Sequence, residues 1–105
     1  MSKAEVRNAA DETQVAKAGK AEEEKRRQEL NDIRTVLSTI SGRRLLWRMM
    51  EQCKTFSSVM DNSAAKVTYN AGKQDLGHFI MAEIVEADEN LLFKMMKEQK
   101  NGEKE

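Results

Sequence analysis

The sequence has 105 residues with 18 basic and 18 acidic side chains, and its zero formal net charge argues against a strongly basic nucleic-acid binder. One cysteine and one histidine are too few for an intrachain disulfide or for a zinc site built from Cys and His. Hydrophobic residues make up 39% of the chain, enough for one modest core, and the absence of proline disfavours architectures rich in turns and strands.

The first segment that we predict is a charged arm over residues 1–28. Val6 and Val15 are its branched aliphatic residues, and residues 21–27 are almost entirely charged. Alanine and long charged side chains favour a helix one by one, but no apolar stripe is present to anchor that helix. We therefore expect an arm that is disordered in the free protein and becomes helical on assembly. A simple solvated tail is the alternative.

From residue 29 onward, apolar residues recur every three or four positions, which predicts a helical domain over residues 29–98. The first set is Leu30, Ile33, Leu37 and Ile40. Ser41 and Gly42 interrupt it, so we expect Gly42 to end a helix or to form a tight corner with a positive φ. A second helical set follows: Leu45, Leu46, Met49, Met50, Cys53 and Phe56.

The second half of this domain predicts a loop and two more helices. Residues 57–70 are rich in Ser, Asn and Asp, which indicates a loop with one helical turn near Val59 and Met60. We expect a third helix to begin near Asn70, and Asp88 to cap a fourth. A polar tail covers residues 99–105, with Gly102 as a stop. The expected fold is all-α, a small bundle of three to four short helices.

Two groups of residues in the second predicted helix are candidates for contact with a partner. Trp47, Arg48, Met49 and Met50 combine apolar and basic groups that suit a partner surface, whereas an ordinary methionine-rich core is the alternative. Arg43, Arg44 and Arg48, with Lys54, could contact phosphates. The alternative is ion pairing within the chain, because residues 35–62 have four basic and two acidic side chains and residues 63–105 have six and eight.

A Cys–His enzyme is the remaining chemical alternative. His78 would need an orienting carboxylate, for which Asp75 lies one helical turn earlier, and Cys53 would be the nucleophile. Cys53 falls on the apolar stripe, however, where a structural thiol is the default. We expect no enzyme, no cofactor and no metal. Apolar runs of only four or five residues predict no membrane span.

Two sequence blocks carry a resemblance. The first comprises Asp32, Leu37, Gly42, Arg43, Arg44, Cys53 and Phe56, and the second Tyr69, Gly72, Lys73, Asp75, Leu76 and Gly77. Together they resemble a family of small virion proteins of short-tailed bacteriophages, named after a protein of a Bordetella phage. Here Gly72-Lys73 stands where the family more often has a Gly-Arg pair.

The resemblance implies a structural or assembly component of the phage particle, in the head, at the portal and tail, or among the internal proteins. The implied partners are other virion proteins (portal, capsid, tail or internal proteins) and further copies of the chain. The implied location is the virion, and the host cytoplasm during assembly. A nucleic-acid-associated protein that touches the packaged genome through Arg43, Arg44 and Arg48 is the alternative, disfavoured by the zero net charge.

Overall fold

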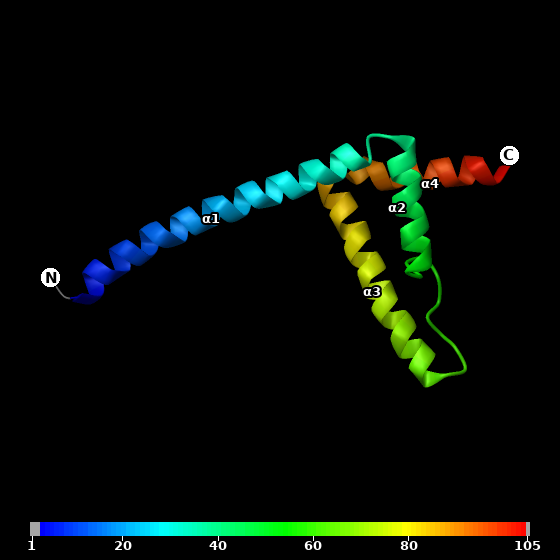
Figure 1. Ribbon diagram of the computed structural model, residues 1–105, viewed down its shortest axis with the longest axis horizontal. Coiled ribbons are helices and arrows are strands. Elements are labelled where there is room, and N and C mark those ends of the chain that lie inside the picture. Colours follow the sequence, from blue (N-terminus) through cyan, green and yellow to red (C-terminus); the bar gives the residue numbers. More distant parts are fainter. Residues whose placement is uncertain (1–2, 105) are drawn as a thin grey trace.

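The structure is a computed structural model that describes residues 3–104, with side chains described for residues 11–102. Its four helices are α1 (Lys3–Val36), α2 (Ile40–Gln52), α3 (Ala64–Ala87) and α4 (Glu89–Lys104). No strand occurs among residues 3–104, so the all-α prediction is confirmed. In Figure 1, α1 projects as a long arm from a body in which α2 and α3 form a V, and α4 runs from the upper end of α3 and passes behind α2. The molecule is flat, with extents of 73 × 38 × 16 Å.

The core is small and draws one side chain from each part of the body. Leu37, Met50, Ile84 and Met95 are the four residues at its centre, and each is at most 2% exposed. Partly buried apolar side chains surround them: Ile33, Leu46, Trp47, Ile80, Met81, Leu91 and Leu92. Because all of these residues lie between 33 and 95, most of α1 has no part in the core.

Helix α1 runs without a break through the arm from Lys3 onward, and residues 1–2 of the predicted arm lie outside the described residues. Residues 11–25 are all exposed, in keeping with their lack of an apolar stripe. Among the described side chains of α1, Arg26 is the first that forms an ion pair with the body. Its guanidinium contacts Glu83 and Glu86 on α3. The described part of the arm is therefore a helix continuous with the turn that carries Leu30 and Ile33.

The break between the first two helices lies at residues 37–39, earlier than predicted, and Ile40 begins α2 instead of ending α1. Thr39 is the N-cap of α2, and its Oγ1 accepts a hydrogen bond from the Gly42 amide at 3.1 Å. The prediction of a positive φ at Gly42 is wrong. A Cβ there would lie 1.9 Å from the Val36 carbonyl oxygen, so a glycine is required by the close approach of two backbones.

Helix α3 begins at Ala64, six residues before the predicted start, because Ser63 caps it. Ser63 Oγ accepts from the Lys66 amide, and Asp61 Oδ1 accepts from the Ser63 amide at 3.0 Å. Residues 58–61 form no helical turn, so the turn expected near Val59 and Met60 is absent. The Ser- and Asp-rich composition that suggests a loop is partly a helix-capping signal here.

The ends of α4 show one correct and one wrong expectation. Asp88 caps the helix as predicted, with Oδ1 accepting from the Asn90 amide at 2.9 Å. Gly102 does not stop it, because α4 continues to Lys104 through most of the predicted polar tail.

The loop between α2 and α3, residues 53–63, is held by a polar stripe on α3. Asn70, Gln74 and His78 recur every four residues and donate to backbone carbonyl oxygens of that loop. Gln74 Nε2 alone bonds two of them, Lys54 O and Ser57 O, each at 2.9 Å. The stripe fixes the loop against α3 without using apolar side chains.

Lys54 has a φ of 54°, the left-handed conformation, immediately after α2. The Lys54 amide bonds Glu51 O and the Thr55 amide bonds Met50 O, which is the hydrogen-bond pattern of a Schellman helix end. Glycine adopts this conformation without Cβ strain, so Lys54→Gly should raise the free energy of unfolding by up to about 1 kcal/mol. Urea unfolding measures the change. Lys54→Ala is the control and should bring no gain, whereas an equal gain for both variants would contradict this explanation.

Candidate functional site

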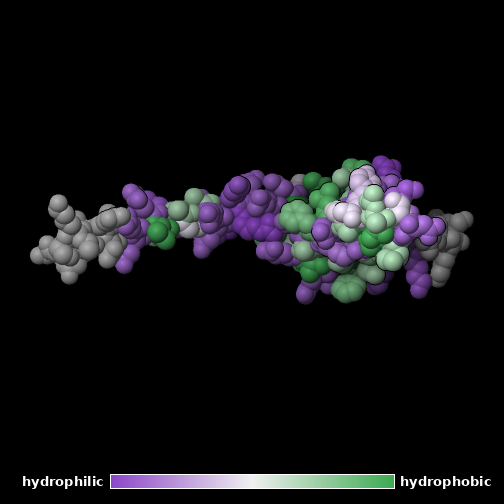
Figure 2. Space-filling view, turned by 90° about the horizontal axis from the view of Figure 1, so that it is seen from below, coloured by the Kyte–Doolittle hydropathy of each residue, from purple (hydrophilic) through white to green (hydrophobic). Residues whose placement is uncertain are grey.

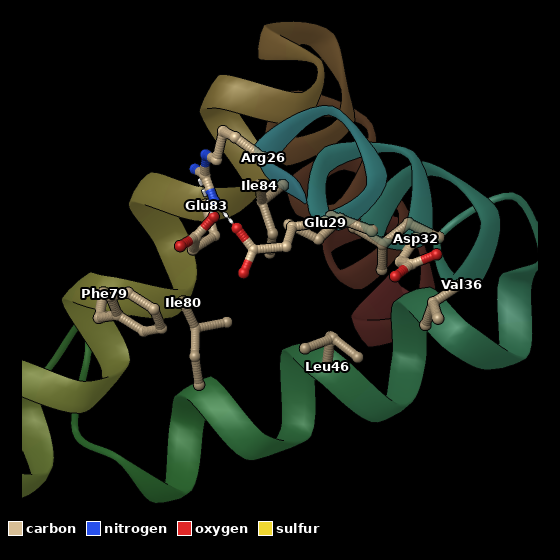
Figure 3. Close-up of a pocket in the computed structure, with 11 residues that line it drawn as sticks. Arg26, Glu29, Asp32, Val36, Leu46, Phe79, Ile80, Glu83 and Ile84 are labelled. Carbon is tan, nitrogen blue, oxygen red and sulfur yellow. Dashed lines mark ion pairs between the residues drawn. The ribbon is translucent and has the colours of Figure 1, made fainter. Parts of the chain in front are cut away.

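An open groove of about 430 Å³ lies between α1, α2 and α3 (Figure 3). Its apolar lining is Ile33, Val36, Leu37, Leu46, Phe79, Ile80 and Ile84. Leu37 and Ile84 are buried and form its floor, whereas Val36 and Phe79 are about half exposed at its sides. Such a surface can accommodate apolar side chains of a partner.

The rim of the groove is charged and mostly acidic. Glu29, Asp32 and Glu83 contribute three carboxylates, and Arg26 contributes one guanidinium. Arg26 Nη2 lies 2.6 Å from Glu83 Oε2 and 2.5 Å from Glu86 Oε2. Its hydrogen bond lowers the pKa of Glu86, and the same bond raises the pKa of Arg26, so both groups stay ionised at neutral pH. An apolar groove with an acidic rim suits a segment that combines apolar and basic side chains.

Arg43 does not line the groove. It lies on the buried side of α2, where it links three parts of the chain. Its Nε and Nη2 donate to the two Glu98 carboxylate oxygens at 2.7 and 3.0 Å, and its Nη1 donates to Leu37 O at 2.9 Å. The Arg43 side chain is only 9% exposed. The hydrogen bond from Arg43 lowers the pKa of Glu98. Arg43 therefore joins α2 to α4 and to the link after α1.

This placement corrects the hypothesis of a phosphate-binding cluster. Arg43 is buried and paired with a carboxylate of the same chain, so it cannot form a joint surface with Arg44 and Arg48, which are exposed. Ion pairing within the chain is the correct interpretation for Arg43.

A family model described as Bbp19-like phage protein matches residues 33–97. This match covers more than half of the chain. The chain belongs to the Bbp19-like phage protein family. The resemblance stated from the two sequence blocks is thereby confirmed. No curated protein sequence and no solved structure matches the chain.

The Bbp19-like region comprises the end of α1, all of α2 and α3, and the first half of α4. It contains the whole core and the apolar lining of the groove. Arg26, Glu29 and Asp32 precede it, so the part of the acidic rim that α1 supplies lies outside the match.

The residues of the two sequence blocks serve several different structural purposes. Asp32 and Leu37 line the groove. Gly77 is buried against the end of α2, where a Cβ would lie 2.0 Å from Thr55 Oγ1 and 3.0 Å from the Cys53 Cβ. By contrast, Gly72 has open space beside it, and Lys73 Nζ lies 4.9 Å from the centre of the Tyr69 ring.

The predicted partner-contact residues of α2 separate onto different faces. Met50 is fully buried, so it belongs to the core and is not available to a partner in this fold. Trp47 is partly buried and stacks on Phe56, with ring centroids 5.0 Å apart. Met49 is 46% exposed, and Arg48 is exposed as well. Of the chemical pair considered from the sequence, His78 Nε2 donates to Thr55 O at 3.2 Å, and Cys53 is the C-cap residue of α2.

Some contacts could not be recognised from the sequence. Arg34 Nε donates to Ala87 O at 2.6 Å and so satisfies a carbonyl at the end of α3. This bond joins residues 53 positions apart, and no local motif indicates it. Across the side chains that the structure describes, no three or more His, Cys, Asp or Glu gather as a potential metal site. None of the helices, as far as they are described, is long and apolar enough to cross a membrane.

Proposed function

We propose that this Bbp19-like phage protein is a structural or assembly component of the virion that acts through protein–protein contacts rather than catalysis. The observation that carries the proposal is the shape of the chain. Its Cα radius of gyration is 20.7 Å, whereas a compact domain of this length has about 13 Å. Its accessible surface is 8228 Å², against about 6,000 Å² for a compact monomer of the same mass.

Large apolar side chains are exposed over the body, which supports the same function. Twelve of them belong to residues 36–96: Val36, Ile40, Leu45, Met49, Phe56, Met60, Tyr69, Leu76, Phe79, Val85, Phe93 and Met96. Figure 2 shows this green surface concentrated on the body, whereas the arm is mostly purple. Apolar surface of this extent is typical of proteins that bind other proteins. The partners that fit the proposal are portal, capsid, tail or internal proteins of the particle, and other copies of the chain.

The arm provides the test of this function. In the phage that encodes the protein, deleting residues 1–24 should weaken incorporation into particles while changing the thermal stability of the isolated protein little. Residues 11–24 are exposed, and the described ion pairs to α3 begin at Arg26, which the deletion keeps. Quantitative mass spectrometry of purified particles and thermal unfolding of the purified variant measure the two effects.

The matched control replaces Glu22 and Glu23 by glutamine and leaves the length of the arm unchanged. This variant should still enter particles. If the full-length protein is made during infection but is absent from particles and from assembly intermediates, the proposed function is wrong. If the deletion instead unfolds the protein, the arm belongs to the folded unit and residue 28 is not its boundary.

A further inference from the structure

We propose that the acid-rimmed groove receives the outward face of α4 from a second copy of the chain, so that copies associate head to tail. The groove offers apolar residues from three helices beneath a rim of three carboxylates and one guanidinium. Its occupant must therefore carry exposed apolar side chains with basic groups beside them. The chain itself has such a surface.

The α4 ridge consists of Phe93, Met96, Lys97 and Lys100, which lie on one side of the helix because they are three, four and seven residues apart. Phe93 is 63% exposed and Met96 is 45% exposed, and both lysines are exposed. Met95 is fully buried and lies on the other side of α4, which faces the core. Phe and Met are enriched where proteins bind each other, and the two lysines complement the carboxylates of the groove.

The groove and the α4 ridge lie on opposite faces of the flat body. Leu37 and Ile84 line the groove and also contact the buried cluster that contains Met95 of α4. The eleven residues around the groove belong to α1, α2, α3 and the link after α1, so α4 lies beneath the floor. Figure 3 shows its red ribbon behind the groove residues, and Figure 2 shows apolar surface at both edges of the thin body.

A contact between two different surfaces on opposite faces is heterologous. It produces a ring if the rotation from one copy to the next returns to the first copy, and a filament if it does not. Each copy would use both surfaces, and two patches of ordinary size bury about 1,600 Å² per copy. The surface of this chain exceeds that of a compact monomer by about 2,200 Å², part of which belongs to the arm. The zero net charge of the chain is compatible with a close association of identical copies.

A charge exchange tests this contact on the full-length protein. One variant, Lys97→Glu with Lys100→Glu, makes the α4 ridge acidic, and the other, Glu29→Lys with Asp32→Lys, makes the groove rim basic. Each variant alone should self-associate more weakly than the wild type, by on the order of tenfold or more in the dissociation constant. Sedimentation velocity over a wide concentration range measures it, and circular dichroism checks that each variant is folded.

Mixing the two variants should restore association, because the unchanged basic ridge of one then meets the unchanged acidic groove of the other. Arg44→Glu with Arg48→Glu makes the same change of charge on α2, beside the exposed Leu45 and Met49, and serves as the matched control. It should self-associate like the wild type. Phe93→Asp tests the apolar part of the contact and should also weaken association.

Three outcomes would overturn the proposal. A wild type that stays monomeric would leave the groove to a different protein. A control variant on α2 that alone loses association would assign the contact to α2, and a mixture that fails to associate would show that groove and ridge do not meet. This inference rests on the proposed function, because the contact would operate during assembly of the particle. The two are tested separately, however. Self-association of the purified protein can be absent although the protein enters particles, and it can be present although the protein does not enter particles.

Discussion

An alanine at position 42 should lower the free energy of unfolding by about 3 kcal/mol, the upper part of the range for side chains forced into a packed site. Its Cβ would lie 1.9 Å from the Val36 carbonyl oxygen and 2.9 Å from the Val36 carbonyl carbon. Both are backbone atoms, so the contact can be relieved only by separating α1 from α2. Gly77→Ala should cost about 2 kcal/mol, because the nearest atom is the Thr55 hydroxyl oxygen, a side-chain atom.

Gly72→Ala is the matched control for both variants. Gly72 also lies inside a helix, but its Cβ would meet no atom within 4 Å. Alanine favours a helix over glycine by up to about 1 kcal/mol, so this substitution should stabilise the protein. Urea unfolding of the three variants therefore distinguishes the sites by the sign of the change. Wild-type stability in Gly42→Ala would mean that α1 and α2 do not approach this closely.

The second large effect is expected at the Arg43–Glu98 pair. Arg43→Met should lower the free energy of unfolding by about 2 kcal/mol, since it leaves the Glu98 carboxylate and the Leu37 carbonyl without their donor. Arg44→Met should change it by less than about 0.5 kcal/mol, because Arg44 is exposed. Replacing both partners, Arg43→Met with Glu98→Leu, should cost less than Arg43→Met alone, and a greater cost would contradict this account.

The same pair should make stability depend on pH. The pKa of Glu98 is lowered in the folded protein from its ordinary value of about 4.5, chiefly by the hydrogen bond from Arg43. The folded state then binds fewer protons than the unfolded state as the carboxylate titrates. The pair therefore contributes its full stability above about pH 4.5 and loses it as the pH falls through the lowered pKa. Glu98→Gln should flatten this acid dependence, as seen in thermal unfolding between pH 3 and pH 7.

Apolar spacing identified much of the fold because apolar residues recur at helical intervals where the helices pack. Leu37 and Met50, two of the four residues at the centre of the core, occur in the two apolar sets that the sequence analysis names. The position of the break between α1 and α2 was harder to predict from the sequence. Leu37 to Ile40 continue a helical spacing, and only Thr39, whose hydroxyl caps α2, marks the actual start.

The candidate site was harder to predict, because it depends on which residues meet across the fold. The balance of charge between the two halves of the domain indicated ion pairs for Arg43, but nothing local singles out Glu98. The groove combines residues from 26 to 84, and Arg26 on its rim belongs to the segment that the sequence predicts to be a charged arm. Gly42 and Gly77 can be noticed in the sequence because they are glycines. The reason that each site needs a glycine is a close contact with neighbouring backbone or side-chain atoms, which is visible only once the helices are packed.

Because α1 is continuous, the distance and the direction of each arm residue from the body follow from helix geometry. At about 1.5 Å per residue, the stretch from Lys3 to Lys25 extends roughly 35 Å before the first clamp to α3. Each residue also turns the helix by about 100°. One inserted residue would therefore lengthen the arm only slightly but would rotate all residues before it about the helix axis. Seven inserted residues would nearly keep the bearing and would move the tip outward by about 10 Å. The distance of an arm residue from the body and the direction in which it faces are therefore set together, by the number of residues between it and Arg26.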